Sequence, residues 1–152
     1  LKIGDKTIID YNIDRLISFG VDDFWISVRY LADQIKEHFG NGNSRNVSIE
    51  YVNEDTPLGT IGAVSKINNI KHDYVLVTNS DILTNLNYEN FLEDFIEKDA
   101  DMSVVTIPYD VEIPYAVIET KSNNILSFIE KPTYTYYSNG GIYLIKKSIN
   151  CF

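Results

Sequence analysis

The sequence predicts a single α/β domain with a three-layer, Rossmann-like arrangement and a mixed, mostly parallel sheet. Short apolar runs rich in β-branched residues alternate with segments of helical periodicity along most of the chain. Later the rhythm changes to closely spaced strands, which is typical of antiparallel hairpins. With 152 residues and 44% hydrophobic content, the chain is long enough to bury one core.

The predicted elements follow one another with short connections. Apolar residues at helical spacing predict a helix over residues 7–19, which Gly20 ends. Further helices are predicted at residues 31–39, 61–67 and 91–96, and strands at 24–28, 47–52, 74–77, 102–107, 115–119, 125–130 and 141–145. The sequence contains neither an internal repeat nor a linker, so we predict one domain over residues 1–152.

The first predicted helix begins almost at the start of the sequence. A doubly wound sheet places its first strand and its phosphate-binding loop before the first helix. We therefore expect residues 1–152 to be a partial domain in which the first strand and the phosphate loop are missing.

Composition excludes several classes of partner. Thirteen basic and 22 acidic residues give a net charge of −9, which opposes nonspecific binding to nucleic acid or anionic lipid. The sequence has neither an apolar stretch long enough to cross a bilayer nor a secretory signal, so we expect a cytoplasmic protein without a membrane partner. The histidines, His38 and His72, have no cysteine or third histidine near them, so no zinc site is predicted.

Residues 54–63 form the first candidate binding segment, because they join a predicted strand to a predicted helix. Pro57 fixes its own φ, and Gly59 and Gly62 allow a ligand or a neighbouring element to approach the backbone closely. Thr60 is a suitable N-cap for the helix that follows. Spacing alone favours a well-built turn over a ligand site, and neither a GxGxxG motif nor a Walker loop occurs in the chain.

The second candidate is the aspartate that follows the apolar strand at residues 74–77. Open α/β sheets bind ligands beyond the carboxyl ends of their strands, where Asp81 is expected, although an aspartate there can also cap a turn. Glu130 and Lys131 before Pro132 are, by themselves, typical of a solvated strand end. Asn139 precedes two glycines and suits either a sugar contact or a turn. A nearby group of tyrosines is interpreted as packing residues: Tyr134, Tyr136 and Tyr137.

Considered together, the motifs resemble those of the sugar-phosphate nucleotidyltransferase family, enzymes that make nucleotide sugars from an NTP and a sugar 1-phosphate. The matching segments are Leu1-Lys2-Ile3-Gly4-Asp5-Lys6, Pro57-Leu58-Gly59-Thr60 with Gly62-Ala63, Asn79-Ser80-Asp81, Tyr115-Ala116-Val117, Phe128-Ile129-Glu130-Lys131-Pro132 and Asn139-Gly140-Gly141-Ile142-Tyr143. They occur in the family's order and cover essentially the whole chain. Within the family, the chain is most similar to guanylyltransferases that act on mannose 1-phosphate or a related sugar.

The resemblance implies a role for each of these segments. Asp81 would bind the Mg²⁺ that bridges the reacting phosphates, and Lys131 would meet the sugar phosphate, so these two are the catalytic candidates. Nucleotide binding is assigned to Glu54, Pro57, Leu58, Gly59 and Thr60, and sugar binding to Ala116, Glu130, Lys131 and Asn139. The implied partners are an NTP, with GTP favoured, and a sugar 1-phosphate, and a homo-oligomer is compatible with the family.

The chain departs from the family's pattern in places that bear on activity. Ala116 and Ser80 stand where the family usually has glycine, and the Gly-rich loop and the second metal-binding carboxylate are not among these residues. We therefore expect the isolated 152 residues to be inactive or nearly so. Two alternatives remain open: a non-catalytic nucleotide-sugar-binding or regulatory subunit, and a metal-dependent glycosyltransferase of the GT-A type. The second is disfavoured because Asn79-Ser80-Asp81 contains one carboxylate instead of a spaced pair.

Overall fold

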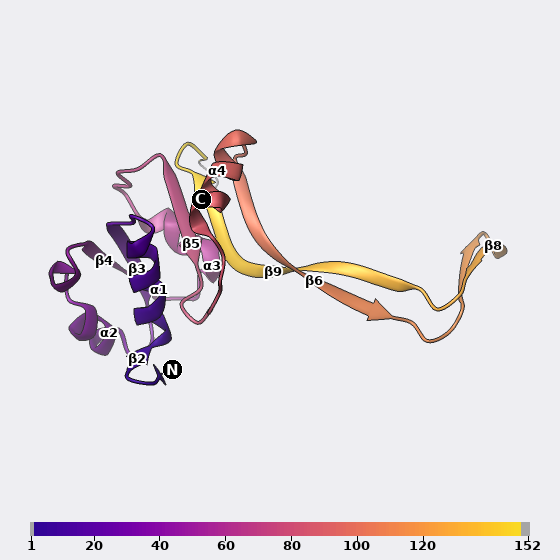
Figure 1. The fold of residues 1–152 in the computed structure, drawn as a ribbon, viewed down its shortest axis with the longest axis horizontal. Coiled ribbons are helices and arrows are strands. Elements are labelled where there is room, and N and C mark those ends of the chain that lie inside the picture. The colour runs from indigo at the N-terminus through magenta and orange to yellow at the C-terminus, as the bar shows by residue number, and fades with distance from the viewer. Residues whose placement is uncertain (1, 150–152) are drawn as a thin grey trace. The chain divides into compact units, whose positions relative to one another are not determined.

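The computed structural model describes residues 2–149, and the chain divides into two units (Figure 1). Unit 1 comprises Leu1–Ser103 and Gly141–Phe152, and unit 2 comprises Val104–Gly140. Cys151 of the sequence lies outside the described residues. Between residues 2 and 149, no helix has the length and apolar character needed to span a membrane.

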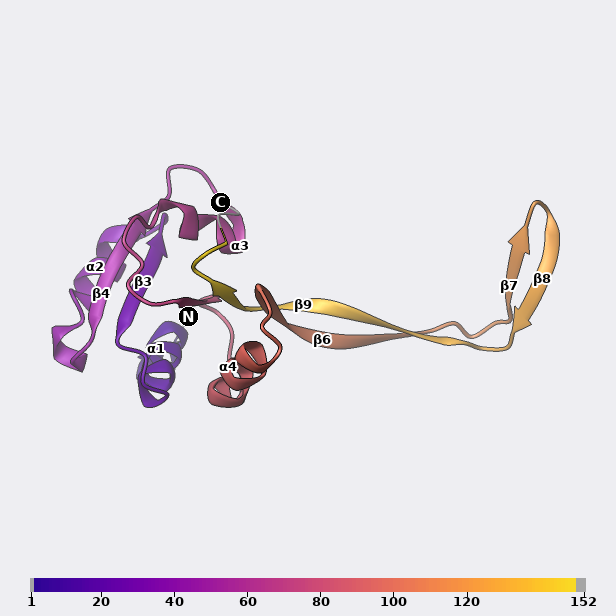
Figure 2. The ribbon, with the colours of Figure 1, turned by 90° about the horizontal axis from the view of Figure 1, so that it is seen from above.

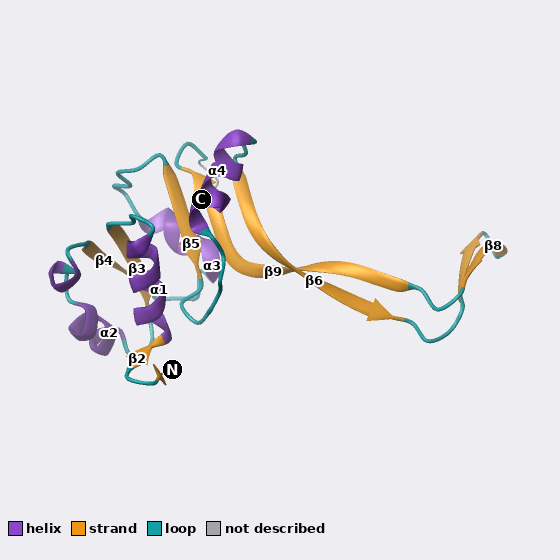
Figure 3. Ribbon diagram, in the orientation of Figure 1, coloured by secondary structure: helices purple, strands orange, loops and turns teal. Residues whose placement is uncertain are grey.

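Unit 1 contains all the described helices, whereas unit 2 is built from strands and turns (Figure 3). The helices are α1 (Ile8–Ser18), α2 (Ala32–Phe39), α3 (Gly59–Gly62) and α4 (Tyr88–Glu97), with 3₁₀ turns η1 (Asn43–Arg45) and η2 (Ala63–Lys66). The strands of unit 1 are β1 (Lys2–Ile3), β2 (Lys6–Thr7), β3 (Asp23–Val28), β4 (Ser48–Asn53) and β5 (Tyr74–Thr78). Strands β7 (Val117–Lys121) and β8 (Asn124–Ile129) belong to unit 2, and β6 (Met102–Glu112) and β9 (Thr133–Lys146) have residues in both units.

The sheets combine parallel and antiparallel pairs. Strands β3 and β4 pair in parallel from Asp23 opposite Ser48 to Val28 opposite Asn53. A second sheet has the order β5-β9-β6, in which β5 and β9 are antiparallel, and β7 and β8 form an antiparallel hairpin. The predicted mixed α/β class is therefore confirmed, as is the change to antiparallel strands late in the chain.

Helices cover both faces of the strands of unit 1. In Figure 2, α1 and α4 lie on one side of these strands and α3 lies on the other. The rings of Phe19, which follows α1, and Tyr88 of α4 meet edge to face with centroids 5.5 Å apart. The strands and helices bury a shared set of apolar side chains: Ile13, Leu16, Phe24, Val28, Ile49, Val52, Phe95, Ile142, Leu144 and Ile145. Burial of these side chains is the main stabilising term of unit 1.

Several predicted boundaries differ from the observed ones. The helix expected at residues 61–67 starts at Gly59 and becomes a 3₁₀ turn at Ala63, because the backbone of Leu58 is already helical. Leu58 is thus the N-cap, and the assignment of that position to Thr60 was wrong. Strands β6 and β9 extend well beyond the predicted residues 102–107 and 141–145, because they pair with each other in the sheet of order β5-β9-β6.

Gly42 has a backbone conformation and surroundings that exclude a side chain. Its φ is +86°, and a Cβ would lie 2.5 Å from the carbonyl oxygen of Val47 and 2.8 Å from Cγ1 of Ile49. Gly42→Ala should lower the free energy of unfolding by about 2–4 kcal/mol, combining the left-handed φ with the backbone clash. Gly40→Ala is the matched control, since Gly40 also has a positive φ but no atom within 4 Å of its Cβ position. Urea unfolding of both variants measures the difference in the free energy of unfolding. Equal losses of stability would show that the clash with Val47 does not contribute to the effect of Gly42→Ala.

Candidate functional site

The candidate site lies at one edge of unit 1, where strands β3, β4 and β5 have their carboxyl ends. The Nζ of Lys71, just before β5, lies 3.0 Å from Oδ1 of Asp23, the first residue of β3. His72 similarly approaches Asp22, with Nε2 and Oδ1 3.8 Å apart. Because β5 and β3 start together and β4 runs parallel to β3, all three strands end at the opposite edge. The predicted nucleotide-binding loop follows β4 there, and Asp81 follows β5.

Glu54 is the first residue of this loop, and both its backbone and its side chain form hydrogen bonds. Its backbone N–H donates to the carbonyl of Val28 at 3.0 Å, which joins the loop to the end of β3. Its carboxylate accepts hydrogen bonds from the hydroxyl of Ser27 and, at 3.2 Å, from the amide of Leu58. The hydrogen bond from Ser27 lowers the pKa of Glu54, so this side chain is ionised at neutral pH.

The two glycines of the loop have different roles. Gly59 has φ +75° and no atom within 4 Å of its Cβ position, so the space beside its backbone is open. At Gly62 a Cβ would lie 2.9 Å from Cβ of Leu58, so this glycine permits close packing within the loop. The backbone of Gly59 therefore faces open space, and Gly62 leaves room for a neighbouring residue.

Asp81 lies exposed in the turn after β5. The backbone around it is held by a hydrogen bond from Asn12 Nδ2 to the Ser80 carbonyl, 3.2 Å, and by one from the Asn79 amide to the Gly141 carbonyl, 3.0 Å. The N-cap of the next helix, α4, is Asn87, so Asp81 does not cap it. Within residues 2–149 no group of three acidic, histidine or cysteine side chains is placed to hold a metal ion. A cation at Asp81 would thus need most of its ligands from elsewhere.

Unit 2 contains the residues assigned to the sugar. Ala116 is exposed just before β7, and Glu130 and Lys131 are exposed between β8 and β9. Lys131 has φ +43°, an uncommon conformation for a long side chain. Asn139 lies inside β9, so of the two alternatives left open for it the turn is excluded, and the sugar contact stays a prediction.

The packing interpretation of the tyrosines is also wrong for two of them. Tyr136 and Tyr137 are 60% and 71% exposed, respectively, because unit 2 has no helix among the described residues to cover its strands.

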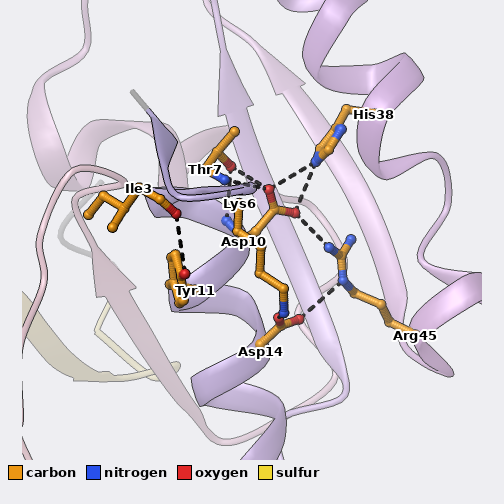
Figure 4. Close-up of polar contacts among 8 residues, drawn as sticks. All are labelled: Ile3, Lys6, Thr7, Asp10, Tyr11, Asp14, His38 and Arg45. Carbon is orange, nitrogen blue, oxygen red and sulfur yellow. Dashed lines mark hydrogen bonds and ion pairs between the residues drawn. The ribbon is translucent and has the colours of Figure 1, made fainter.

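A buried carboxylate in α1 was missed by the sequence analysis (Figure 4). Asp10 is 3% exposed and accepts hydrogen bonds from the Thr7 hydroxyl at 2.6 Å, Arg45 at 2.6 Å and His38 Nε2 at 2.9 Å. Burial alone would raise the pKa of Asp10, but the hydrogen bonds from Thr7 and His38 outweigh it and hold the pKa far below its usual range. The spacing of Thr7 and Asp10 matches a capping box with Asp in place of Glu, which is the signal that could have located this site.

Ser27 was also missed, although it holds Glu54. It lies within a strand whose other residues are mostly apolar, and nothing in the local sequence links it to a residue 27 positions later. Only the parallel pairing of β3 with β4 places the two ends together.

Comparison with known proteins gives one consistent family. The family model for nucleotidyl transferase matches residues 1–152. The chain is 29% identical over 149 residues to D-glycero-alpha-D-manno-heptose 1-phosphate guanylyltransferase of Aneurinibacillus thermoaerophilus, covering 97% of this chain and 64% of that protein. It is 27% identical over 168 residues to UTP--glucose-1-phosphate uridylyltransferase of Synechocystis sp., covering 98% of this chain and 43% of that protein. The chain therefore spans less than two thirds of either relative.

Solved structures give the same result. The crystal structure of HddC from Yersinia pseudotuberculosis superposes with a TM-score of 0.71 at 26% identity, covering 98% of this chain and 67% of that one. Its complex with GMP-PN gives a TM-score of 0.70 with the same coverage. The family model matches the full sequence, and the solved structures share its fold. Both findings agree with the family that the order of the sequence motifs indicates. The chain belongs to the nucleotidyl transferase family.

Proposed function

We propose that the protein containing this chain transfers a nucleotidyl group from an NTP to a sugar 1-phosphate. A phosphate oxygen of the sugar 1-phosphate attacks the α-phosphorus of the NTP, the bond to the β-phosphate oxygen breaks, and pyrophosphate leaves. No covalent enzyme intermediate is required, so the protein acts by positioning and by charge neutralisation. The observation that carries the proposal is the open backbone at Gly59 after β4, at the same edge of unit 1 as the exposed Asp81 after β5.

The loop of unit 1 suits the nucleotide. An open Gly59 lets a flat base approach the main chain, where N–H and C=O groups read its edge without a side chain in the way. Guanine is the favoured base, because the first relative is a guanylyltransferase and HddC was solved with GMP-PN. Because another relative is a uridylyltransferase, UTP is the main alternative substrate.

The exposed carboxylate of Asp81 fits Mg²⁺, which is bound through one or two carboxylates and completes its coordination with phosphate oxygens and water. When bound, Mg²⁺ would neutralise charge on the reacting phosphates. The Asp81 side chain would fix the ion, while Asn12 and Gly141 hold the backbone just before it, at Ser80 and Asn79.

The residues of unit 2 are proposed for the sugar. Lys131 is the cation for the sugar phosphate, and Glu130 and Asn139 would hydrogen-bond sugar hydroxyls. The positive φ of Lys131 supports a role, since strained backbone often occurs at binding sites. Ala116 favours a second candidate function, a non-catalytic nucleotide-sugar-binding subunit, because its Cβ would crowd a sugar resting on the backbone.

Pyrophosphate release by the full-length protein tests the proposal. GTP, UTP, dTTP, ATP and CTP are each paired with mannose, glucose and D-glycero-D-manno-heptose 1-phosphates in the presence of Mg²⁺. We expect GTP with a mannose-type sugar 1-phosphate to give the highest rate, and the isolated 152 residues to give little or none. Binding of a nucleotide sugar without turnover of any pair would select the non-catalytic subunit.

A further inference from the structure

We propose that Glu54 is a positioning residue that fixes the Gly59–Thr60 segment through the backbone of Leu58, instead of contacting the nucleotide itself. This inference rests on the proposed function, because it assigns Glu54 a task in nucleotide binding. It revises the assignment of Glu54 as a direct nucleotide ligand.

Both carboxylate oxygens of Glu54 already have partners. One accepts from the Ser27 hydroxyl in β3, and the other accepts from the Leu58 amide at 3.2 Å. The amide of Glu54 is itself bonded to Val28, 3.0 Å away. The side chain therefore connects the end of β3 to the backbone four residues further along its own loop.

Leu58 is held from two sides. Its amide is bonded to Glu54, and its Cβ occupies the space left by the missing side chain of Gly62. With Leu58 fixed, the positive φ of Gly59 directs the chain into α3. The open backbone of Gly59 thus has a defined place relative to the strand ends, which lowers the conformational entropy that nucleotide binding would otherwise cost.

The chemistry of the side chain favours this indirect role. An ionised carboxylate accepts from two donors at once, and charge-assisted hydrogen bonds of this kind are among the stronger ones. A direct contact with the triphosphate would place like charges together, which is unfavourable. Glutamine carries no charge and has one acceptor oxygen, so Glu54→Gln would lose both charge-assisted bonds: one donor keeps a neutral acceptor, and the other faces the amide NH₂ group.

The test is nucleotide binding by Glu54→Gln and Ser27→Ala in the full-length protein, measured by calorimetry with GTP and by steady-state kinetics. Displacing a binding segment costs on the order of 10- to 100-fold, so we expect Glu54→Gln to raise the Kd and KM for GTP by about that factor and to change kcat by less than about threefold. Ser27→Ala should shift the Kd in the same direction by less. The double variant should resemble Glu54→Gln alone, because both residues act on one loop.

Amide hydrogen exchange at Leu58 reports the positioning directly and should be faster in Glu54→Gln, whether or not nucleotide is present. Glu50→Gln is the matched control, since Glu50 is an exposed glutamate on β4, the strand that Glu54 follows, and should leave both Kd and exchange unchanged. Unchanged GTP binding or unchanged Leu58 exchange in Glu54→Gln would overturn the inference while leaving the proposed function intact. A wild-type protein that binds no NTP would overturn both.

Discussion

Asp81→Asn should abolish nucleotidyl transfer, lowering the rate of pyrophosphate release by at least about 10³-fold, because loss of one charge-stabilising group at a phosphate site has effects of this order. The substitution keeps the size of the side chain and removes the charge that a hard cation needs. Asp81 is exposed and Asn87 caps the following helix, so the variant should fold with an unchanged unfolding midpoint. Pyrophosphate release and Mg²⁺-dependent GTP binding measure the two consequences.

Asp73→Asn is the control for this variant. Asp73 is exposed and lies just before the first residue of β5, so the same substitution is made at the opposite end of the same strand. We expect Asp73→Asn to retain full activity. If Asp81→Asn keeps Mg²⁺-dependent GTP binding and turnover, Asp81 does not bind the metal.

Asp10→Ala should be the most destabilising truncation of a polar side chain in α1. It removes the acceptor for Thr7, His38 and Arg45 together and breaks the capping box. Breaking a buried ion pair costs about 3–5 kcal/mol, and the partial exposure of Arg45 and His38 places the expected loss near the lower limit. Urea unfolding followed by circular dichroism measures the change.

Asp14→Ala is the matched control, since Asp14 lies on the same helix and also contacts Arg45, at 3.3 Å, but is 35% exposed. Exposed ion pairs contribute about 0–1 kcal/mol, so this variant should lose far less stability. Equal losses in the two variants would show that burial of Asp10 is not the source of its contribution.

The stability that Asp10 provides should depend on pH. Its pKa is lower in the folded protein than in the unfolded chain, where it is about 4. A lowered folded-state pKa means that the contribution is fully present above about pH 4 and is lost as the pH falls through the folded pKa. The difference in free energy of unfolding between the wild type and Asp10→Ala should therefore shrink below about pH 4. A difference that is constant from pH 7 to pH 2 would contradict the assigned ionisation.

Much of unit 1 could be predicted because its elements obey local rules. Helix α1 was located within one residue at each end, since its apolar face has helical spacing and Gly20 follows it. Strands β3 and β4 were located similarly, because short β-branched runs between polar turns have few alternatives. The order of the motifs also gave the family.

Unit 2 and the contacts of the candidate site depend on information that is not local. The length of β9 was underestimated because an asparagine before two glycines, as at Asn139, is also typical of a turn, whereas pairing with β6 keeps Asn139 within the strand. The hydrogen bond to Glu54 could not be predicted, because the hydroxyl that donates it comes from a strand 27 residues earlier. Long-range hydrogen bonds of this kind have no periodicity that a single sequence can display.

The fate of the labelled α-phosphate of GTP tests nucleotidyl transfer most directly. In the full-length protein with Mg²⁺ and mannose 1-phosphate, we expect label from [α-³²P]GTP to appear in a phosphatase-resistant nucleotide sugar, and label from [γ-³²P]GTP to appear in pyrophosphate. Both products should be absent in Asp81→Asn. Two results would contradict nucleotidyl transfer: release of the γ-label as inorganic phosphate, and transfer of the γ-label to the sugar. In either case the α-label would remain in GDP.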